Sequence, residues 1–106
     1  MAGANKQISI PSQWQSKQFS VGTAFIQISK SNYTIQDIAN LLLYASSSNN
    51  DLIYFSPDGT NIAGELTAGS ATTLPLELSR YSPLFVKSKT GTQTLYISAF
   101  DGGLIF

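Results

Sequence analysis

Residues 51–59 read Asp51–Leu52–Ile53–Tyr54–Phe55–Ser56–Pro57–Asp58–Gly59, a short apolar run followed by a turn sequence. The order of Pro57, Asp58 and Gly59 fits a type I turn. The same pattern of apolar run and turn recurs downstream, with further runs at Thr73–Leu76, Leu84–Val86 and Leu95–Ile97. Short strands at this spacing are typical of sandwiches and barrels. We therefore predict an all-β fold, an antiparallel β-sandwich of roughly seven or eight short strands, of which a small jelly roll is one form.

The long strand candidate Gln18–Ser29 changes face along its length. Phe19, Val21, Thr23 and Phe25 share one side, whereas Ile26 and Ile28 fall on the other. Since side chains alternate strictly along a strand, this change near Thr23–Ala24 predicts a bulge or a strand that passes between two environments.

The stretch Tyr33–Ala45 allows two interpretations. Thr34 and Asp37 fit a helix start, and the apolar residues that follow fall at helical spacing, which predicts a helical turn at 34–39. As a strand, Leu41–Ala45 ends at the polar loop Ser46–Asn50 and forms a hairpin with the next run. We favour the strand for Leu41–Ala45 and leave the helical turn open.

Composition restricts the classes of partner. The chain has 106 residues, enough for one domain (residues 1–106), with six basic and six acidic residues and only 11% charged residues. Ser, Thr, Asn and Gln fill about a third of the positions instead. A neutral chain lacks the basic patch that nucleic acid or an anionic membrane requires, so we expect neither partner. A neutral polar surface is typical of a subunit packed within an assembly, although an ordinary extracellular β domain looks similar.

We find no targeting or membrane segment. Met1–Asn5 lacks the basic and apolar regions of a signal peptide. The longest aliphatic cluster, Leu41–Ala45, is far shorter than the roughly 18 residues of a membrane span.

The chain contains few residues that are suited to catalysis. There is no His and no Cys, which removes the commonest general base and the best nucleophile. The carboxylates are scattered singly, and Asp58 and Asp101 each precede Gly, as turn residues do. Asn49–Asp51 and Asp58–Asn61 offer oxygen ligands for calcium, but neither has EF-hand spacing. We expect no enzyme activity, no catalytic residues, no metal site and no cofactor.

The two ends of the chain are the candidate interface. We expect residues 1–17 to form an extended arm with Trp14 as its anchor, and residues 102–106 to form an apolar tail. A free terminus is usually polar, so this tail should dock on its own domain or on a neighbouring subunit. The predicted interface residues are Ile8, Ile10, Trp14, Phe19, Tyr81, Leu104, Ile105 and Phe106.

Sugar binding is the other use of such aromatic residues. Exposed rings could stack on sugars while Asn and Gln supply hydrogen bonds, although aromatic residues on strands more often pack within the fold. The candidates are Trp14, Tyr33, Tyr54, Tyr81 and Tyr96.

Three segments of the second half carry a resemblance to a known group of proteins. The runs 52–59, 64–76 and 84–99 read LIYFSPDG, GELTAGSATTLPL and LFVKSKTGTQTLYISA. This order of strand and turn, closed by a hairpin with Val86–Lys87 and Gly91, resembles small accessory structural proteins of tailed-phage virions. The resemblance covers about residues 51–100 and consists of a β-sandwich pattern without a catalytic signature.

The resemblance implies a structural protein of a bacteriophage capsid or tail, assembled in the host cytoplasm. We expect a capsid decoration or cement subunit, with a head-fibre base and a tail component as related forms. Its partners would be the major capsid protein or other virion proteins, and it would self-associate, with a trimer as our expectation. The alternative is a receptor- or glycan-binding module of a phage tail or adhesin.

Overall fold

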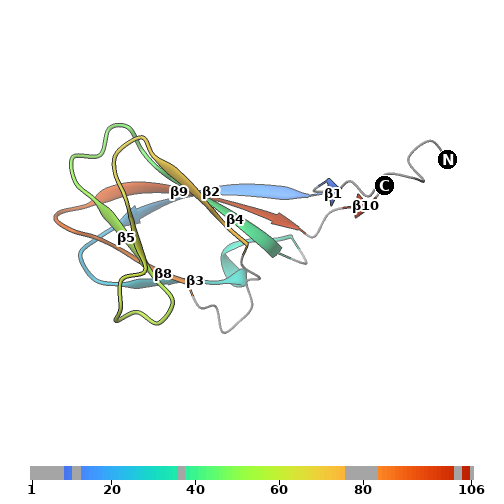
Figure 1. Cartoon of the computed structure of the whole chain (residues 1–106), viewed down its shortest axis with the longest axis horizontal. Coiled ribbons are helices and arrows are strands. Elements are labelled where there is room, and N and C mark those ends of the chain that lie inside the picture. The colour runs from blue at the N-terminus through green and yellow to red at the C-terminus, as the bar shows by residue number, and fades with distance from the viewer. Residues whose placement is uncertain (1–8, 11–12, 36–37, 76–83, 102–103, 106) are drawn as a thin grey trace.

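The computed structural model describes residues 9–10, 13–35, 38–75, 84–101 and 104–105, with only the backbone for 9–10 and 104–105. Eight strands form two antiparallel sheets of four strands each (Figure 1). The first sheet has the order β2 (Trp14–Val21), β9 (Gln93–Asp101), β4 (Ile38–Ala45), β7 (Ala71–Leu74). The second has the order β3 (Ile26–Ile28), β8 (Leu84–Ser88), β5 (Ile53–Ser56), β6 (Gly64–Leu66). Beyond them β1 (Ser9–Ile10) pairs with β10 (Leu104–Ile105).

The strand pairs are nested from the two ends of the chain toward its middle. β1 pairs with β10, β2 with β9, β3 with β8, β4 with β7 and β5 with β6, all antiparallel. Successive pairs of the eight main strands alternate between the two sheets, as in a long ribbon rolled into a sandwich. This is the arrangement of a jelly roll. The predicted all-β sandwich is therefore confirmed, in its jelly-roll form.

The change of face near Thr23 marks a passage between sheets. β2 ends at Val21 in the first sheet, and β3 begins at Ile26 in the second. Between them the Gly22 carbonyl already accepts a hydrogen bond from Ser88 N of the second sheet, at 2.7 Å. Val21 and Ile28 are both fully buried because each faces the core from its own sheet. Of the two interpretations, the strand passing between environments is correct.

The strand interpretation of Leu41–Ala45 is also confirmed, and β4 begins earlier, at Ile38. The helical turn at 34–39 is not seen: Thr34 and Ile35 are irregular, and Ile38 and Ala39 belong to β4, while 36–37 lie outside the described residues. A 3₁₀ turn, η1 (Lys30–Asn32), lies just upstream. Burial explains the outcome, since Leu41, Leu43 and Ala45 face the core with the strand period. Ile38 is buried as well, because the register of β4 shifts between Ile38 and Asn40.

The structure places the last four residues of the predicted arm, 14–17, in a strand of the sandwich. β2 begins at Trp14, so 14–17 form part of the first sheet, where they pair with residues 97–100 of β9. Residues 1–8 and 11–12 lie outside the described part of the chain. In the described ranges no helix is long and apolar enough to cross a lipid bilayer.

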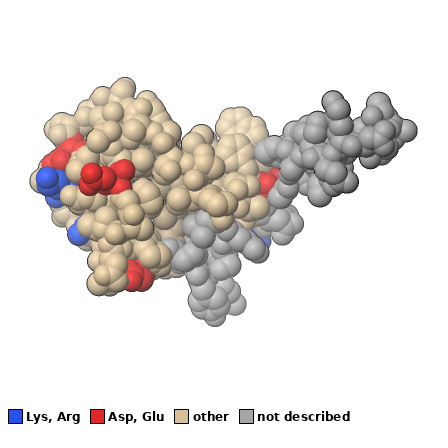
Figure 2. All heavy atoms as spheres, viewed as in Figure 1, with Lys and Arg blue, Asp and Glu red and all other residues tan. Residues whose placement is uncertain are grey.

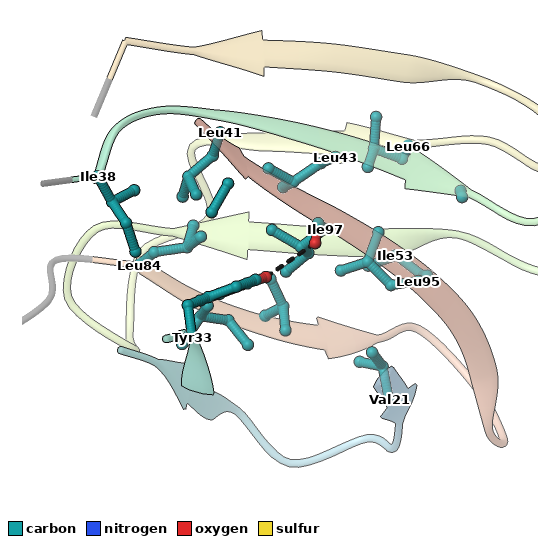
Figure 3. Packing of buried hydrophobic residues seen from close by; sticks show 14 of the residues in the cluster. Val21, Tyr33, Ile38, Leu41, Leu43, Ile53, Leu66, Leu84, Leu95 and Ile97 are labelled. Atoms are coloured by element: carbon teal, nitrogen blue, oxygen red, sulfur yellow. Dashed lines mark hydrogen bonds between the residues drawn. The ribbon is translucent and has the colours of Figure 1, made fainter. Parts of the chain in front are cut away.

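The core lies between the two sheets and is almost entirely aliphatic (Figure 3). Each fully buried Ile or Leu contributes about 1.5–3 kcal/mol relative to an exposed one. Tyr33 is the polar exception: its ring is buried, and its hydroxyl donates to the Ile97 carbonyl at 2.8 Å. Burial raises the pKa of this hydroxyl well above its usual range. The largest fully buried apolar side chains are Val21, Ile28, Ile38, Leu41, Leu43, Ile53, Val86, Leu95 and Ile97.

Candidate interaction surface

The outer face of the first sheet follows from the alternation along β9. Gln93, Leu95, Ile97 and Ala99 are buried, and the residues between them are only partly covered. Side chains directly opposite each other on paired strands lie on the same side of the sheet. The registers with β2, β4 and β7 therefore define one outward surface. We call it the neutral face; its residues are Trp14, Ser16, Gln18, Ser20, Asn40, Leu42, Tyr44, Ala71, Thr73, Thr94, Tyr96, Ser98 and Phe100.

None of the side chains of the neutral face carries a charge. The outer side of the second sheet differs, because Tyr54 there lies opposite Glu65 on one neighbouring strand and Lys87 on the other. On the face of the molecule drawn in Figure 2, most charged atoms lie at the end opposite β1 and β10. A partner on the neutral face would therefore meet no charge that has to be desolvated.

Two aromatic pairs cross between strands on the neutral face. Trp14 stacks on Phe100 with ring centroids 6.0 Å apart and planes inclined by 16°. Tyr44 stacks on Tyr96 at 5.9 Å and 30°. Trp14 keeps 64% of its surface exposed and Tyr44 keeps 36%, so packing within the sheet leaves large ring areas open to solvent. Phe100 and Tyr96 are separated by about 13 Å along β9, with Ser98 midway.

Uncharged side chains cover the area between the two aromatic pairs. Ser98 lies opposite Ser16 on one side and Leu42 on the other, and Gln18 lies opposite Tyr96. The centre of a protein–protein interface is typically enriched in aromatic residues and depleted of charged residues, as this surface is. The same combination of rings, hydroxyls and amides also suits a neutral sugar chain.

Of the predicted interface residues, Trp14 lies fully on the neutral face. Phe19 does not: it stands opposite the buried Leu95 on the core side of β2 and packs against the core. Phe19 follows the strand period of Val21 rather than that of Trp14, so the two predicted residues lie on opposite sides of β2. Ile8, Tyr81 and Phe106 lie outside the described residues.

The arm and the tail pair with each other. Ser9 lies opposite Ile105 and Ile10 opposite Leu104. This short ladder is in the same register as the β2–β9 ladder, because Ile10↔Leu104 and Trp14↔Phe100 are equally far apart on both strands. Figure 1 shows β1 and β10 at one end of the molecule, beyond the sandwich.

The aromatic residues considered for sugar binding separate into three groups. Trp14 and Tyr96 belong to the neutral face, Tyr54 lies on the opposite sheet, and Tyr33 is buried and unable to stack on a ligand. Sequence reasoning missed Tyr44, Leu42 and Phe100. The alternation of Leu95 to Phe100 contained a signal for Phe100, but the partner strands of β9 could not be identified from the sequence.

Asp58 organises the loop between β5 and β6. Its carboxylate accepts hydrogen bonds from Thr60 N (2.8 Å), Asn61 N (2.8 Å), Asn61 Nδ2 (2.8 Å) and Ser56 Oγ (3.0 Å). Ser56 Oγ in turn accepts from Asp58 N and Gly59 N. The backbone N–H groups of Asn61 and Thr60 hold the pKa of Asp58 well below its usual range. Asp58 is thus fully engaged as a turn residue.

The loop between β4 and β5 is tied to β9 by amide side chains. Asn49 behaves like an added strand residue: its Oδ1 accepts from Thr94 N and its Nδ2 donates to Thr94 O, both at 2.8 Å. The buried Gln93 accepts from Asn50 N and donates to Asn50 Oδ1 and Thr90 O. The Thr90 hydroxyl and Leu52 N lower the pKa of Asp51 by donating to its carboxylate. The side-chain oxygens of residues 49–51 therefore take part in hydrogen bonds that hold this loop in place.

No three His, Cys, Asp or Glu residues come together to hold a metal in the part of the chain that the structure describes. A hollow of about 240 Å³ opens between the ends of β5 and β7. Among the described residues of its lining, Ser56 is the only polar one, and its hydroxyl is already engaged with Asp58. The lining residues are Phe55, Ser56, Pro57, Ala63, Leu74, Pro75 and Leu84.

Comparison of the chain with protein families, with curated proteins and with solved structures finds no match.

Proposed function

We propose that this protein is a non-enzymatic structural subunit of a virion, a capsid decoration or cement protein that binds its neighbours through the neutral face. The observation that supports this proposal is the uncharged outer surface of β2, β9, β4 and β7 with its two aromatic pairs. Burying such a surface against a shell protein gains the hydrophobic contribution without desolvating a charge. The stabilisation would come from bridging neighbouring shell subunits, which resists expansion of the shell.

The fold adds an argument by analogy. Jelly rolls recur in viral capsid domains and in lectins. Fold analogy does not assign a function, because one fold carries many functions. It supports the proposal only together with the composition of the neutral face, where exposed rings such as Trp14 are of the type that dominates interface energies.

The test is a single charge placed at the centre of the neutral face. Ser98→Lys introduces an ammonium between Ser16 and Leu42, and burying it unpaired costs several kcal/mol, which lowers affinity by more than about 100-fold. The matched control is Tyr54→Lys, on the outer side of the other sheet. Each variant is added to shells of the encoding virus prepared without this protein, and occupancy is measured by co-sedimentation.

We expect Ser98→Lys to leave the shells bare and Tyr54→Lys to saturate them like the wild type. Circular dichroism and urea unfolding check that both variants fold. If Ser98→Lys saturates the shells at wild-type concentrations, the neutral face is not the binding surface and the proposal is wrong.

A second candidate function is favoured by the exposure of Trp14. Trp14 is 64% exposed and lies on the same face as Ser16, Asn40 and Ser98, which could hydrogen-bond to a sugar stacked on the indole. This arrangement supports a receptor- or glycan-binding module of a tail or adhesin. Binding on a glycan array that disappears with Trp14→Ala would favour this function over the first.

A further inference from the structure

The β2–β9 ladder shows which backbone groups of β2 lack a partner. Asp101 N donates to Gln13 O at 3.1 Å, one step beyond the pair Trp14↔Phe100. Hydrogen-bonded and non-bonded pairs alternate along an antiparallel ladder. The residues of β2 that bond to β9 are therefore Gln15, Lys17, Phe19 and Val21. The N–H and C=O groups of the alternate residues point away from β9, and no described residue pairs with them; these residues are Trp14, Ser16, Gln18 and Ser20.

β2 is also the longest edge strand of the described sandwich. It runs for eight residues with an unbroken register and no proline. The other edges are short: β3 and β6 have three residues each, and β7 has four and is followed by Pro75. Short strands and proline are the means by which proteins protect an edge from pairing. Only β2 offers a long edge without them.

We propose that β2 pairs antiparallel with β2 of a second copy of this chain about a two-fold axis, so that the neutral faces of the two copies form one continuous surface. This inference rests on the proposed function: if the neutral face binds the shell, the second copy is the neighbour that extends this binding surface. A second copy fits for two reasons. The chain has no net charge, so copies do not repel each other, and two β2 strands meeting antiparallel match free N–H groups with free C=O groups wherever they overlap.

Lys17 selects the register. The registers that pair at least five residues of β2 place Ser16, Lys17, Gln18 or Phe19 on the two-fold axis. Placing Lys17 on the axis brings two like charges together. Placing Gln18 or Phe19 there sets Lys17 against an apolar residue, Phe19 or Val21. With Ser16 on the axis, Lys17 lies opposite Gln15 and Trp14 lies opposite Gln18. This is the register that we propose.

Lys17 also makes the pairing weak. It lies on the core side of an edge strand, opposite the buried Ile97, and a charge at such a position opposes edge pairing. The pair should therefore form at high local concentration, as on a crowded shell, rather than in dilute solution. Lys17→Thr removes the charge and should strengthen the pairing.

Single cysteine variants test the register directly, since the chain has no Cys of its own. Under mild oxidation at about 0.5 mM protein, Ser16→Cys should give at least about ten-fold more disulfide-linked dimer than Thr73→Cys, which lies on the same face at the β7 edge. Ser20→Cys should behave like Thr73→Cys, because its opposite residue in this register lies upstream of β2. Non-reducing gels and mass spectrometry quantify the dimer. Equal yields from the Ser16, Ser20 and Thr73 variants would overturn the proposal.

Two further variants separate this inference from the proposed function. Ser16→Pro removes an N–H that the fold does not use, so it should leave the unfolding midpoint nearly unchanged while abolishing self-association at high concentration by light scattering. Ser98→Lys lies on β9, one strand in from the edge, and leaves the free backbone groups of β2 unchanged, so it should block shell binding only. If Ser16→Cys fails to cross-link while Ser98→Lys still leaves shells bare, the pairing alone is wrong. If Ser16→Cys cross-links and Ser98→Lys saturates shells, the proposed function alone is wrong.

Discussion

At the scale of single residues, two polar groups show how local and distant contacts differ. Asp58 receives its hydrogen bonds from Ser56, Thr60 and Asn61, all within three residues, so its role as a turn residue could be predicted from the sequence. The Tyr33 hydroxyl donates a hydrogen bond to Ile97 O, which is far away in the chain. From the sequence alone, Tyr33 was a candidate for an exposed ring that binds sugar. Only the packing of the strands explains its burial.

Asp58→Asn tests the charge in the turn. Because the pKa of Asp58 is lowered in the folded state, its carboxylate stabilises the protein above the unfolded-state pKa near 4, and this stability is lost as the pH falls below it. The urea midpoint of Asp58→Asn should lie below that of the wild type at pH 7, and the difference should shrink between about pH 4 and pH 2. Glu65→Gln, which removes another exposed carboxylate, is the control. A difference that stays constant down to pH 2 would contradict this explanation.

Tyr33→Phe removes the buried hydroxyl and leaves Ile97 O without this donor. We expect a loss of about 1–2 kcal/mol in the free energy of unfolding at pH 7. The raised pKa of Tyr33 means that its stabilising effect is present below the unfolded-state value near 10 and is lost as the pH rises beyond it. Wild type should therefore lose stability above about pH 10 more steeply than Tyr33→Phe. Tyr54→Phe serves as control, and an equal effect of the two substitutions would refute the role of the bond.

At the scale of elements, the pairing of β5 with β6 depends on a missing side chain. Gly64 lies opposite Phe55, and a Cβ atom on Gly64 would collide with the Phe55 ring. Phe55 thereby covers the short strand β6 and packs against the core. The ring of Phe55 explains why β6 begins with glycine.

Gly64→Ala should lower the free energy of unfolding by about 1–3 kcal/mol, because the Phe55 ring has to move out of its place. Gly22→Ala is the matched control, since nothing lies within 4 Å of the added methyl group and the backbone there needs no glycine. It should be neutral or stabilise slightly. Urea unfolding of both variants measures the difference. Equal midpoints would mean that Phe55 adapts freely.

At the scale of the whole molecule, the nested pairing brings the two ends of the chain together. The arm and tail, predicted as separate docking segments, contain the strands β1 and β10 of one ladder, and β2 continues in step with them. The boundary at Trp14 determines how much of the N-terminal segment can be removed without damage to the sandwich. Removing residues 1–17 would delete the first half of β2 and expose β9, whereas removing 1–12 would leave the described part of the first sheet complete.

The truncation lacking residues 1–12 should unfold within a few degrees of the full chain, and the one lacking 1–17 should unfold at least about 5 °C lower. The physical reason is the lost pairing of 14–17 with residues 97–100 of β9. Thermal unfolding followed by circular dichroism measures both. If the two truncations unfold at the same temperature, residues 14–17 contribute nothing to the sandwich and the arm predicted from the sequence is the better description.

The sequence by itself determined the class of fold. Alternation in β8 and β9, turn residues around Asp58 and Gly91, and the strand period in Leu41–Ala45 are local signals, so they remain visible in a linear chain. Composition likewise predicted a neutral surface with few charges, because no arrangement of the fold changes the number of charges.

The tertiary structure decided which residues share a surface. Trp14, Tyr44 and Phe100 come from three strands that are distant in sequence, and only the registers of β9 with β2 and β4 bring them to one face. The same registers turned Phe19 toward the core and left β2 at an edge of the sheet. Tyr33, outside the strands, is buried by the folding of its loop against β9. A one-residue change of register would reverse every one of those faces, and the local sequence does not encode the register between distant strands.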